Sequence, residues 1–562
     1  MKIQYLLALF ILLTSANLLA QTLDFEWANQ YGGMDIDNGR AIHTDTDGHV
    51  YVVGNFEGTA DFDAGVGVNN LTSFGSNDVF VIKLESNGDL IWARQIAKGT
   101  PDAFGTSVGT DDNGNVYTTG VFYGTAEFDP LGATASLTSN GGSDVFTHKM
   151  NANGELVWVK QFGGLENDSG SSTIEANGNV MTTGQYFGTA DFDPGSSSLN
   201  LTASGESDIY FQKLDTDGNL IWAKSIGGIG YDSGSSVLTD ISGNYYSIGS
   251  FSETVDFDSG AGVSELISNG IGDIFILKLD ANGDFTWVKQ IGGISLEIPG
   301  AIQLDDNSDV YVTGSFFDTV DFDPGPGVIN VASIGNMNTF ILKIDQNGDY
   351  IWSKQFGGVD NVNAVDLEVT SEGFLLVSGN FQGTIDFNPN VGIDNLTAIG
   401  QRDIFLQILN SNGEYIWTET IEGAGWDLLG DMSIDENGNI YSTGSFAVTA
   451  DFDPSTNVSN LSSFGSYDMF VQKLNDTPLD LSNLEGKRGF TVYPNPTKGQ
   501  FFVFNDSNSA NVQIRVFDAV GTEVYRSSSI DASGIELSSP SGLYLVEISS
   551  DLGVQRFSLV KN

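Results

Sequence analysis

Seven tryptophans recur along this chain at a nearly constant interval. They stand at Trp27, Trp92, Trp158, Trp222, Trp287, Trp352 and Trp417, so that successive positions differ by 65, 66, 64, 65, 65 and 65 residues. Two further markers keep the same period: an acid–Phe–acid motif, as in "GTADFDPG" from Gly188, and a strand-like segment whose first copy is "DVFVIKL" from Asp78. Three markers that share one period predict a chain built from repeated units.

Each unit has the pattern of β-structure. In the second unit, "NVYTTGVF", "DVFTHKM" and "LVWVKQF" are β-branched and aromatic runs. Asn-Gly or Asp-Gly pairs separate them, as in "DDNGNV" and "NANGEL". Such pairs supply the positive φ angles of type I′ turns and are a strong signal for hairpins. We therefore expect two hairpins, and so four strands, in each unit.

Seven four-stranded units predict an all-β fold with a seven-bladed β-propeller. The chain begins on a tryptophan strand and its last unit ends without one. We therefore expect the N-terminal strand, Leu23–Tyr31, to be the outer strand of the blade formed by Asp431–Leu474. This pairing would close the ring and remove its open edge.

The repeat "D.F..K....G...W....GG" resembles the bacterial β-propeller repeat known as the SBBP repeat, over roughly Leu23 to Leu474. The tail contains "FTVYPNPTKGQFFV" and "GLYLVEI", which resemble the C-terminal sorting domain of the type IX secretion system of Bacteroidota. That resemblance implies a small β-sandwich at 487–562 that engages the secretion machinery. We expect the propeller at 21–475 and a linker at 476–486.

The N-terminus has the pattern of a signal peptide at 1–20. Lys2 precedes an apolar run from Leu6 to Leu13, and Ala20 is the expected last residue before cleavage. That run is too short for a membrane span, and we expect no transmembrane segment in the mature chain. The expected location is secreted or at the outer cell surface, by way of the periplasm.

The composition limits the partners and the sources of stability. The chain has no cysteine, so it has neither disulfides nor thiolate metal sites. Its formal net charge is −51, which disfavours nucleic acid and anionic membranes and favours cations or basic partners. We expect a monomer without a tightly bound organic cofactor.

The acid–Phe–acid motifs are the main candidate site. In a four-stranded meander, the segments that hold them all lie at one end of the blades. Residues two apart in an extended segment share a side, so both acids of a motif would face outward while Phe turns inward. This expected acidic rim comprises Asp61, Asp63, Glu127, Asp129, Asp191, Asp193, Asp256, Asp258, Asp321, Asp323, Asp386, Asp451 and Asp453.

Two interpretations of the rim stay open. Carboxylates beside glycine-rich loops are calcium ligands, although Ca²⁺ needs six to eight oxygens. Alternatively, the acids are structural, because they can accept backbone N–H bonds in their own turns or pair with cations that also follow the repeat. Those cations are lysines such as Lys83 and Lys343 on the third strand and residues such as Arg94 after the tryptophan. The sixth unit lacks both, with Gln407 and Glu419 at the places assigned to them, and has Asn388 as its second motif residue.

The leading functional hypothesis is a non-catalytic binding or adhesion module whose ligand is a glycan or a protein. No unit has an enlarged loop that would enclose a substrate, and we expect His43, His49 and His148 to lie in different blades. The alternatives are an extracellular carbohydrate-active hydrolase or lyase and a structural surface or matrix protein. Trp426 is the one tryptophan outside the repeat, and it is either a binding anchor on the rim or a packing residue.

Overall fold

The computed structural model divides into two compact units, Met1–Asp476 and Thr477–Asn562. In the first unit it describes residues 24–475, apart from 100, 133–134, 177, 372, 391–392 and 456. In the second it describes 490–561, apart from 494–499, 506–511, 519–522, 530–533, 538–539, 541 and 551–552. The expected signal peptide, its cleavage after Ala20 and the linker at 476–486 lie outside the described residues.

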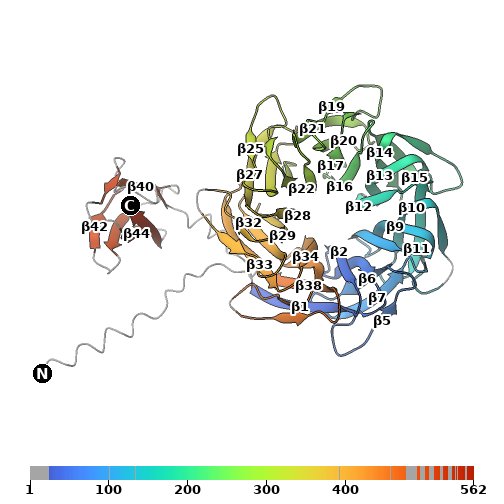
Figure 1. Ribbon diagram of the computed structural model, residues 1–562, viewed down its shortest axis with the longest axis horizontal. Helices are drawn as coiled ribbons and strands as arrows, with labels where there is room; N and C mark the ends of the chain where they lie inside the picture. The colour runs from blue at the N-terminus through green and yellow to red at the C-terminus, as the bar shows by residue number, and fades with distance from the viewer. Residues whose placement is uncertain are drawn as a thin grey trace. The chain divides into compact units, whose positions relative to one another are not determined.

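The first compact unit, Met1–Asp476, is built from repeated antiparallel sheets of four main strands. Figure 1 shows these sheets grouped around a common centre. Each sheet corresponds to one repeat, which is called a unit below. The first strands, which lie innermost, are β2 (Asp37–Thr44), β8 (Ala103–Thr110), β12 (Ser169–Ala176), β16 (Ser233–Thr239), β22 (Ile298–Leu304), β28 (Val362–Val369) and β34 (Leu428–Ile434). The second strands are β3 (Val50–Phe56), β9 (Val116–Glu127), β13 (Asn179–Asp191), β17 (Tyr245–Phe251), β23 (Val310–Phe316), β29 (Leu375–Phe381) and β35 (Ile440–Phe446).

The third and fourth strands complete each sheet. The third strands are β6 (Asp78–Leu84), β10 (Ser136–Met150), β14 (Asn200–Leu214), β20 (Asp273–Leu279), β26 (Asn338–Ile344), β32 (Asp403–Leu409) and β38 (Asp468–Asn475). The fourth strands are β7 (Leu90–Ile96), β11 (Leu156–Gly164), β15 (Leu220–Ile226), β21 (Phe285–Gly293), β27 (Tyr350–Gly358), β33 (Tyr415–Gly423) and β1 (Asp24–Gly33). The last of these comes from the other end of the repeat region.

Strand β1 completes the sheet of β34, β35 and β38. It runs antiparallel to β38, with Asp24 opposite Asn475 and Tyr31 opposite Met469. This is the pairing that the phase of the repeats predicts. The innermost strands also touch in sequence, β2 to β8, β8 to β12, β12 to β16, β16 to β22, β22 to β28 and β28 to β34, and β34 touches β2.

The hairpin turns differ from the expected type I′. In the turn from Glu85 to Asp89, the N–H of Gly88 donates to the Glu85 carbonyl and the N–H of Glu85 donates to the Asp89 carbonyl. Gly88 has φ +86°, whereas Asn87 does not have a positive φ. A type I turn followed by a left-handed glycine forms a G1 bulge, which explains the register shift between Lys83 and Leu84.

A glycine in each second strand allows the sheets to pack closely. A Cβ on Gly54 would lie 1.9 Å from the Asn38 carbonyl oxygen and 2.7 Å from the ring of Phe80. Both contacts are shorter than atoms can approach. Gly54 therefore makes room for the aromatic side chain of Phe80 on the third strand.

The acid–Phe–acid motif belongs to a short extra hairpin between the second and third strands. Five copies form separate strands, β4 (Thr59–Asp61) with β5 (Asn70–Thr72), β18 (Thr254–Asp256) with β19 (Glu265–Ile267), β24 (Thr319–Asp321) with β25 (Asn330–Ala332), β30 (Thr384–Asp386) with β31 (Asn395–Thr397), and β36 (Thr449–Asp451) with β37 (Asn460–Ser462). In the second and third units it is an extension of β9 with β10 and of β13 with β14.

The second compact unit holds two antiparallel sheets. One contains β39 (Phe490–Tyr493), β40 (Gln500–Asn505) and β43 (Ile535–Glu536). The other contains β42 (Glu523–Ser527), β41 (Gln513–Asp518), β44 (Gly542–Ser550) and β45 (Gly553–Lys561). Phe501 and Ile535 of one sheet share a buried core with Val516 and Val546 of the other, so the two sheets pack face to face.

The described residues form strands and turns, and none of them forms a helix long and apolar enough to cross a membrane.

Candidate functional site

The acidic motif joins neighbouring units. In five of the units, the first acid of the motif pairs with the fourth strand of the preceding unit, as Gly163 of β11 opposite Asp191 shows. The same pairing joins Gly32 to Asp61, Gly292 to Asp321, Gly357 to Asp386 and Glu422 to Asp451. The repeated Gly-Gly and the acidic motif therefore lie at the same end of the sheets, as the sequence indicates.

The carboxylates of the motif accept backbone hydrogen bonds within their own hairpin. The Oδ1 atom of Asp191 accepts from the N–H groups of Asp193, at 3.1 Å, and Leu199, at 2.8 Å. The Oδ1 atom of Asp193 accepts from the N–H of Gly195 at 2.8 Å. These bonds hold the ten-residue loop in one conformation.

All seven copies keep this bonding. The first acids that accept two N–H groups are Asp61, Glu127, Asp191, Asp256, Asp321, Asp386 and Asp451. The second residues that accept the next N–H are Asp63, Asp129, Asp193, Asp258, Asp323, Asn388 and Asp453. Each of these side chains is half-buried. The structural interpretation of the rim as a set of turn caps is therefore correct for at least one oxygen of every motif residue.

The phenylalanine of the motif points inward and anchors the hairpin. Phe192 is fully buried, and its ring lies 5.0 Å from Tyr186 and 4.9 Å from Phe162, centroid to centroid. Its carbonyl oxygen accepts a hydrogen bond from Nε2 of Gln212 at 2.8 Å. The alternation of outward acids and inward Phe follows the strand period, as expected.

The repeated lysines of the third strands do not pair with the rim acids in the described ion pairs. Nζ of Lys343 lies 3.1 Å from Asp305 and 3.0 Å from Asp309, and 4.6 Å from the ring centroid of Tyr311. Asp305 and Asp309 flank the turn between the first and second strands, at the opposite end of the sheet from the rim. The expected pairing of rim acids with these lysines is therefore wrong, because the side chains project toward the other end.

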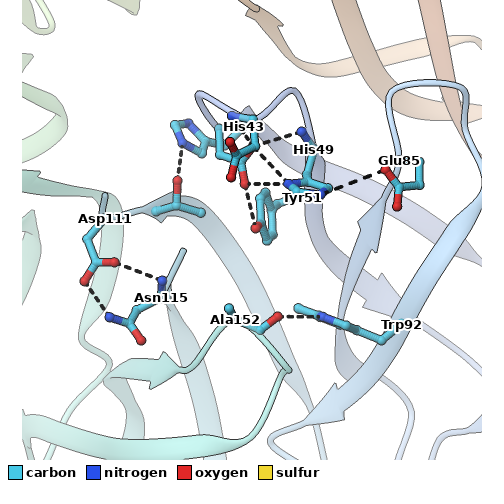
Figure 2. A network of polar contacts seen from close by, with 11 residues as sticks. His43, His49, Tyr51, Glu85, Trp92, Asp111, Asn115 and Ala152 are labelled. Carbon is cyan, nitrogen blue, oxygen red and sulfur yellow. Dashed lines mark hydrogen bonds and ion pairs between the residues drawn. The ribbon is translucent and has the colours of Figure 1, made fainter. Parts of the chain in front are cut away.

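The opposite end of the sheets carries its own polar network. Figure 2 shows the first two units there, with Tyr51 donating to Asp45 at 2.9 Å and Trp92 donating from Nε1 to the carbonyl oxygen of Ala152 in the next unit at 3.1 Å. His49 lies between Asp45, at 3.0 Å, and Glu85, at 3.9 Å. This network links the turns of neighbouring units.

His43 and His49 both belong to the first unit, so the expectation that the three histidines lie in different blades is wrong for these two, and His148 belongs to the second unit. His43 contacts Thr110 at 2.9 Å, and His148 is fully buried with Nε2 at 3.0 Å from the Phe128 carbonyl oxygen. Burial lowers the pKa of His148 to about 4, so it is neutral at physiological pH. Among the described residues, no group of three or more His, Asp or Glu side chains is arranged to hold a metal ion.

In the sixth unit, the residue that takes the place of the repeated lysine lies one position further along the strand than the sequence indicates. Ile408 lies opposite Trp417, in the place that Lys343 takes opposite Trp352. Gln407 is the equivalent of Gln212 and donates to the Phe387 carbonyl oxygen. The lysine of the sixth unit is therefore replaced by Ile408 and not by Gln407.

The indole ring of Trp426 packs against Arg402 on one of its two faces. It is half-buried, with the guanidinium carbon of Arg402 at 5.2 Å from its ring centroid, and its Nε1 donates to Oε1 of Gln401. The cation covers one ring face and the indole N–H has a partner. These contacts favour the packing interpretation of Trp426 over the binding anchor.

A hollow of about 230 Å³ opens beside one copy of the motif. Its lining includes Asp321 and Asp323 of the fifth unit together with Asn269, Lys289 and Gln290 of the fourth. It therefore combines two carboxylates, two carboxamides and an ammonium group at a junction between neighbouring units.

A second set of acids, which the sequence analysis did not identify, lies near the end of the sheets that carries the acidic rim. The first residue of most third strands is a buried acid, and a second buried acid follows four residues after the Gly-Gly, as Asp273 and Glu297 do. The signal was available, because an acid begins the otherwise apolar segment "DIFILKL".

These elements define a class: an all-β repeat protein of four-stranded units with a separate C-terminal β-domain. A family model described as "Beta-propeller repeat" matches residues 91–121, and one described as "Secretion system C-terminal sorting domain" matches residues 491–562. The chain thus carries the SBBP β-propeller repeat and a type IX secretion sorting domain. The sorting domain addresses it to the secretion machinery and to the cell surface or the extracellular space.

Two curated proteins resemble the chain over part of their length. An uncharacterized WD repeat-containing protein of Acanthamoeba polyphaga mimivirus is 22% identical over 508 residues, which is 75% of this chain and 36% of that protein. The regulatory protein FlaEY of Caulobacter vibrioides is 25% identical over 205 residues, 35% of this chain and 21% of that protein. The chain therefore spans little more than a third of the longer match.

Among solved structures, a protein of unknown function from Dyadobacter fermentans has a TM-score of 0.34 at 9% identity, covering 79% of this chain and 98% of that one. PorZ, described as a surface component of the type IX secretion system of Porphyromonas gingivalis, has a TM-score of 0.18 at 10% identity, covering 95% and 100%. Such low scores support no conclusion about this chain.

Proposed function

We propose that residues 21–475 form a closed seven-bladed propeller that acts as a non-catalytic binding module after export. The contacts between successive innermost strands, which return from β34 to β2, support the ring. The pairing of β1 with β38 supports its closure by the N-terminal strand. The mature protein is expected to be a monomer.

The observation that carries the binding proposal is the polar hollow beside Asp321 and Asp323. Pockets that enclose a drug-sized ligand measure about 300–1,000 Å³, so this hollow of about 230 Å³ suits one residue-sized group of a longer ligand. Carboxylates and carboxamides arranged together can hydrogen-bond the neighbouring hydroxyl groups of a sugar ring. We therefore propose a glycan as the ligand.

The repetition of the rim supports binding by several weak contacts. The motif occurs in every unit with the same caps and the same buried Phe. A polymeric ligand that engages two or more such junctions binds more tightly than any one contact allows, because the second contact forms within the complex. This is the arrangement expected of an adhesion surface.

The state of the acids supports a binding role over catalysis. A general acid needs a raised pKa and access to the substrate. In this chain, burial raises the pKa of the fully buried Asp37 and Glu297, and also that of the half-buried Glu419. The carboxylates of Asp321 and Asp323, which line the hollow, cap their own turns.

The sixth unit offers a matched variant for the test. Asn388 caps the N–H of Asn390 as Asp323 caps that of Gly325, so an asparagine keeps the fold of the loop and removes its charge. We expect a variant with Asp→Asn at Asp63, Asp129, Asp193, Asp258, Asp323 and Asp453 to melt like the wild type. It should lose binding on a glycan array.

Retained glycan binding by the six-site variant would show that the rim is not the working face. Binding to extracellular proteins and not to glycans would change the ligand class. Release of new reducing ends from polysaccharides by the wild type, and not by the variant, would establish catalysis instead.

A further inference from the structure

Pairs of buried acids lie at the junctions between neighbouring units. One partner is the acid that begins the repeated third-strand segment, as in "DVFTHKM" and "DIFILKL", and the other stands four residues after the second position of the Gly-Gly in the next connection. Five junctions hold such a pair: Asp468 with Asp37, Asp144 with Asp168, Asp208 with Asp232, Asp273 with Glu297, and Asp403 with Asp427. Every one of these ten side chains is at most 2% exposed.

In two of the pairs, both acids have an oxygen without a hydrogen-bond partner, whereas in the pair of Asp403 with Asp427 only Oδ2 of Asp427 lacks one. Oδ2 of Asp37 accepts from the N–H of Gly33 at 2.7 Å, and Oδ2 of Asp468 accepts from the N–H of Phe464 at 2.9 Å and from Gln30. The Oδ1 atoms of both acids have no partner. A buried, unsatisfied carboxylate oxygen is costly, so the pair calls for a positive partner.

The two carboxyl groups of this pair lie on either side of one glycine. A Cβ placed on Gly32 would be 2.7 Å from Oδ2 of Asp37 and 3.0 Å from Oδ1 of Asp468. Burial, with a contribution from the charge of Asp468, raises the pKa of Asp37 to about 7. The two groups are therefore close enough to share one ligand.

The pair Asp273 and Glu297 also has an unpartnered oxygen on each acid. Oδ2 of Asp273 accepts from Gln290 at 2.5 Å, and Oε2 of Glu297 accepts from the N–H of Gly293 at 3.0 Å. Oδ1 of Asp273 and Oε1 of Glu297 have no partner. In the pairs of Asp144 with Asp168 and of Asp208 with Asp232, by contrast, each carboxylate oxygen accepts at least one hydrogen bond.

The two remaining junctions have other residues in place of the acid pair. At one, Ala103 replaces the second acid, and the charge of Lys98 opposes the rise in pKa that burial causes at Asp78. At the other, Val362 replaces the second acid and Asn338 replaces the first. Neither junction therefore holds two buried acids side by side: one has a lysine near its single buried acid, and the other has lost both acids.

We propose that Asp37 with Asp468, and Asp273 with Glu297, form two buried binding sites for a divalent cation of the calcium type. One such ion would neutralise the two carboxylates of each pair. It would also occupy the unpartnered oxygens. Because Ca²⁺ takes six to eight oxygen ligands, main-chain carbonyls and water must complete the shell. A shared proton is the competing occupant, and it would leave one negative charge.

The first site has a structural consequence. Asp37 begins β2, in the first unit, and Asp468 begins β38, in the last. A cation held by both would join the two ends of the repeat region. This proposal is independent of ligand binding at the rim.

The test uses the full mature protein, stripped with EDTA and then returned to Ca²⁺ at neutral pH. We expect two bound Ca²⁺ ions by elemental analysis and a rise in melting temperature with Ca²⁺. The variant Asp37→Val with Asp468→Asn copies the Val362 and Asn338 junction, so it should fold and bind one ion fewer. The second variant, Asp273→Asn with Glu297→Gln, should also bind one ion fewer and serves if the first fails to fold.

The control is the rim variant Asp321→Asn with Asp323→Asn, which should keep both ions. Loss of the ions in the rim variant, with retention in the paired-acid variants, would overturn the proposal and assign calcium to the rim. No bound ion and no Ca²⁺ effect, with stability that rises on acidification, would overturn it in favour of the shared proton.

Discussion

The ammonium group of Lys343 lies 3.1 Å from Oδ2 of Asp305, inside the end of a sheet that faces away from the acidic rim. Both side chains are largely buried, and Tyr311 lies beneath the ammonium group. Burial alone would lower the pKa of Lys343, but hydrogen bonds with Tyr311, Asp309 and Asp305 raise it above its ordinary value. The lysine is therefore charged and serves the fold.

The substitution Lys343→Ile should destabilise the protein by about 3–5 kcal/mol, because it leaves Asp305 without its cation in a buried place. The sixth unit has Thr370, Leu376 and Ile408 at the three equivalent positions. The triple variant Asp305→Thr, Tyr311→Leu, Lys343→Ile should recover most of that loss. Urea denaturation of both variants checks this, and equal destabilisation of the two would contradict it.

The buried phenylalanine of the motif should contribute more to the free energy of unfolding than the acids beside it. Phe322 lies 5.3 Å from Phe316 and 4.9 Å from Phe340, centroid to centroid, and is 1% exposed. We expect Phe322→Ala to lower the free energy of unfolding by about 3–5 kcal/mol, through lost burial and a cavity. Ile334→Ala, at a side chain that is 60% exposed, should change it by no more than about 0.5 kcal/mol.

Stability of the metal-free protein should fall as the pH rises. Burial raises the pKa of Asp168 and Asp232 to about 6, above their ordinary value of 3.8. The folded state therefore binds more protons than the unfolded state between these values, and the stabilisation present at low pH is lost as the pH passes through the folded pKa. Each group contributes at most about 1.4 kcal/mol per pH unit.

Denaturation midpoints in EDTA should accordingly decrease from about pH 4 to about pH 6. The double variant Asp168→Asn, Asp232→Asn should flatten this slope. Asp240 is the control, because hydrogen bonds from Asn244 and Ser242 outweigh burial and lower its pKa, so that Asp240→Asn should leave the slope in this range unchanged. If the wild type, the double variant and the Asp240→Asn variant all showed the same slope, the raised pKa values of Asp168 and Asp232 would not be its cause.

Closure by the N-terminal strand predicts a disulfide that can be engineered. Asp24 lies opposite Asn475 across β1 and β38, and the chain has no cysteine of its own. Asp24→Cys with Asn475→Cys should therefore form a cross-link under mild oxidation, seen as a mobility shift on a non-reducing gel. Asp24→Cys with Asn347→Cys, in a turn of another unit, should not.

Removal of the C-terminal domain should separate folding from export. A chain that ends at Asn475 should melt at the same temperature as the full chain, because the contacts of the first compact unit lie within it. It should accumulate inside the cell envelope, since it lacks the sorting domain at 491–562. Cell fractionation checks this, and surface display of the truncated chain would contradict it.

Much of the fold could be predicted from local patterns. The tryptophan period, the Asn-Gly and Asp-Gly turns and the missing final strand each depend on a few neighbouring residues, and they led to the four-stranded units and to β1 opposite β38. The turn type was missed, because Asn-Gly serves both the type I′ turn and the G1 bulge, and only the backbone around Gly88 distinguishes them.

The site was predicted less well, since its chemistry depends on contacts between units. The sequence placed thirteen carboxylates at one end of the repeats, and their spacing showed that they face away from the buried Phe. Whether a carboxylate caps a turn, as Asp191 does, or stands buried beside another acid, as Asp37 does, depends on neighbouring strands brought together by folding. The repeat itself was set by the sequence, but the role of each charge was decided by burial and by the hydrogen-bond donors that the tertiary structure brings within reach.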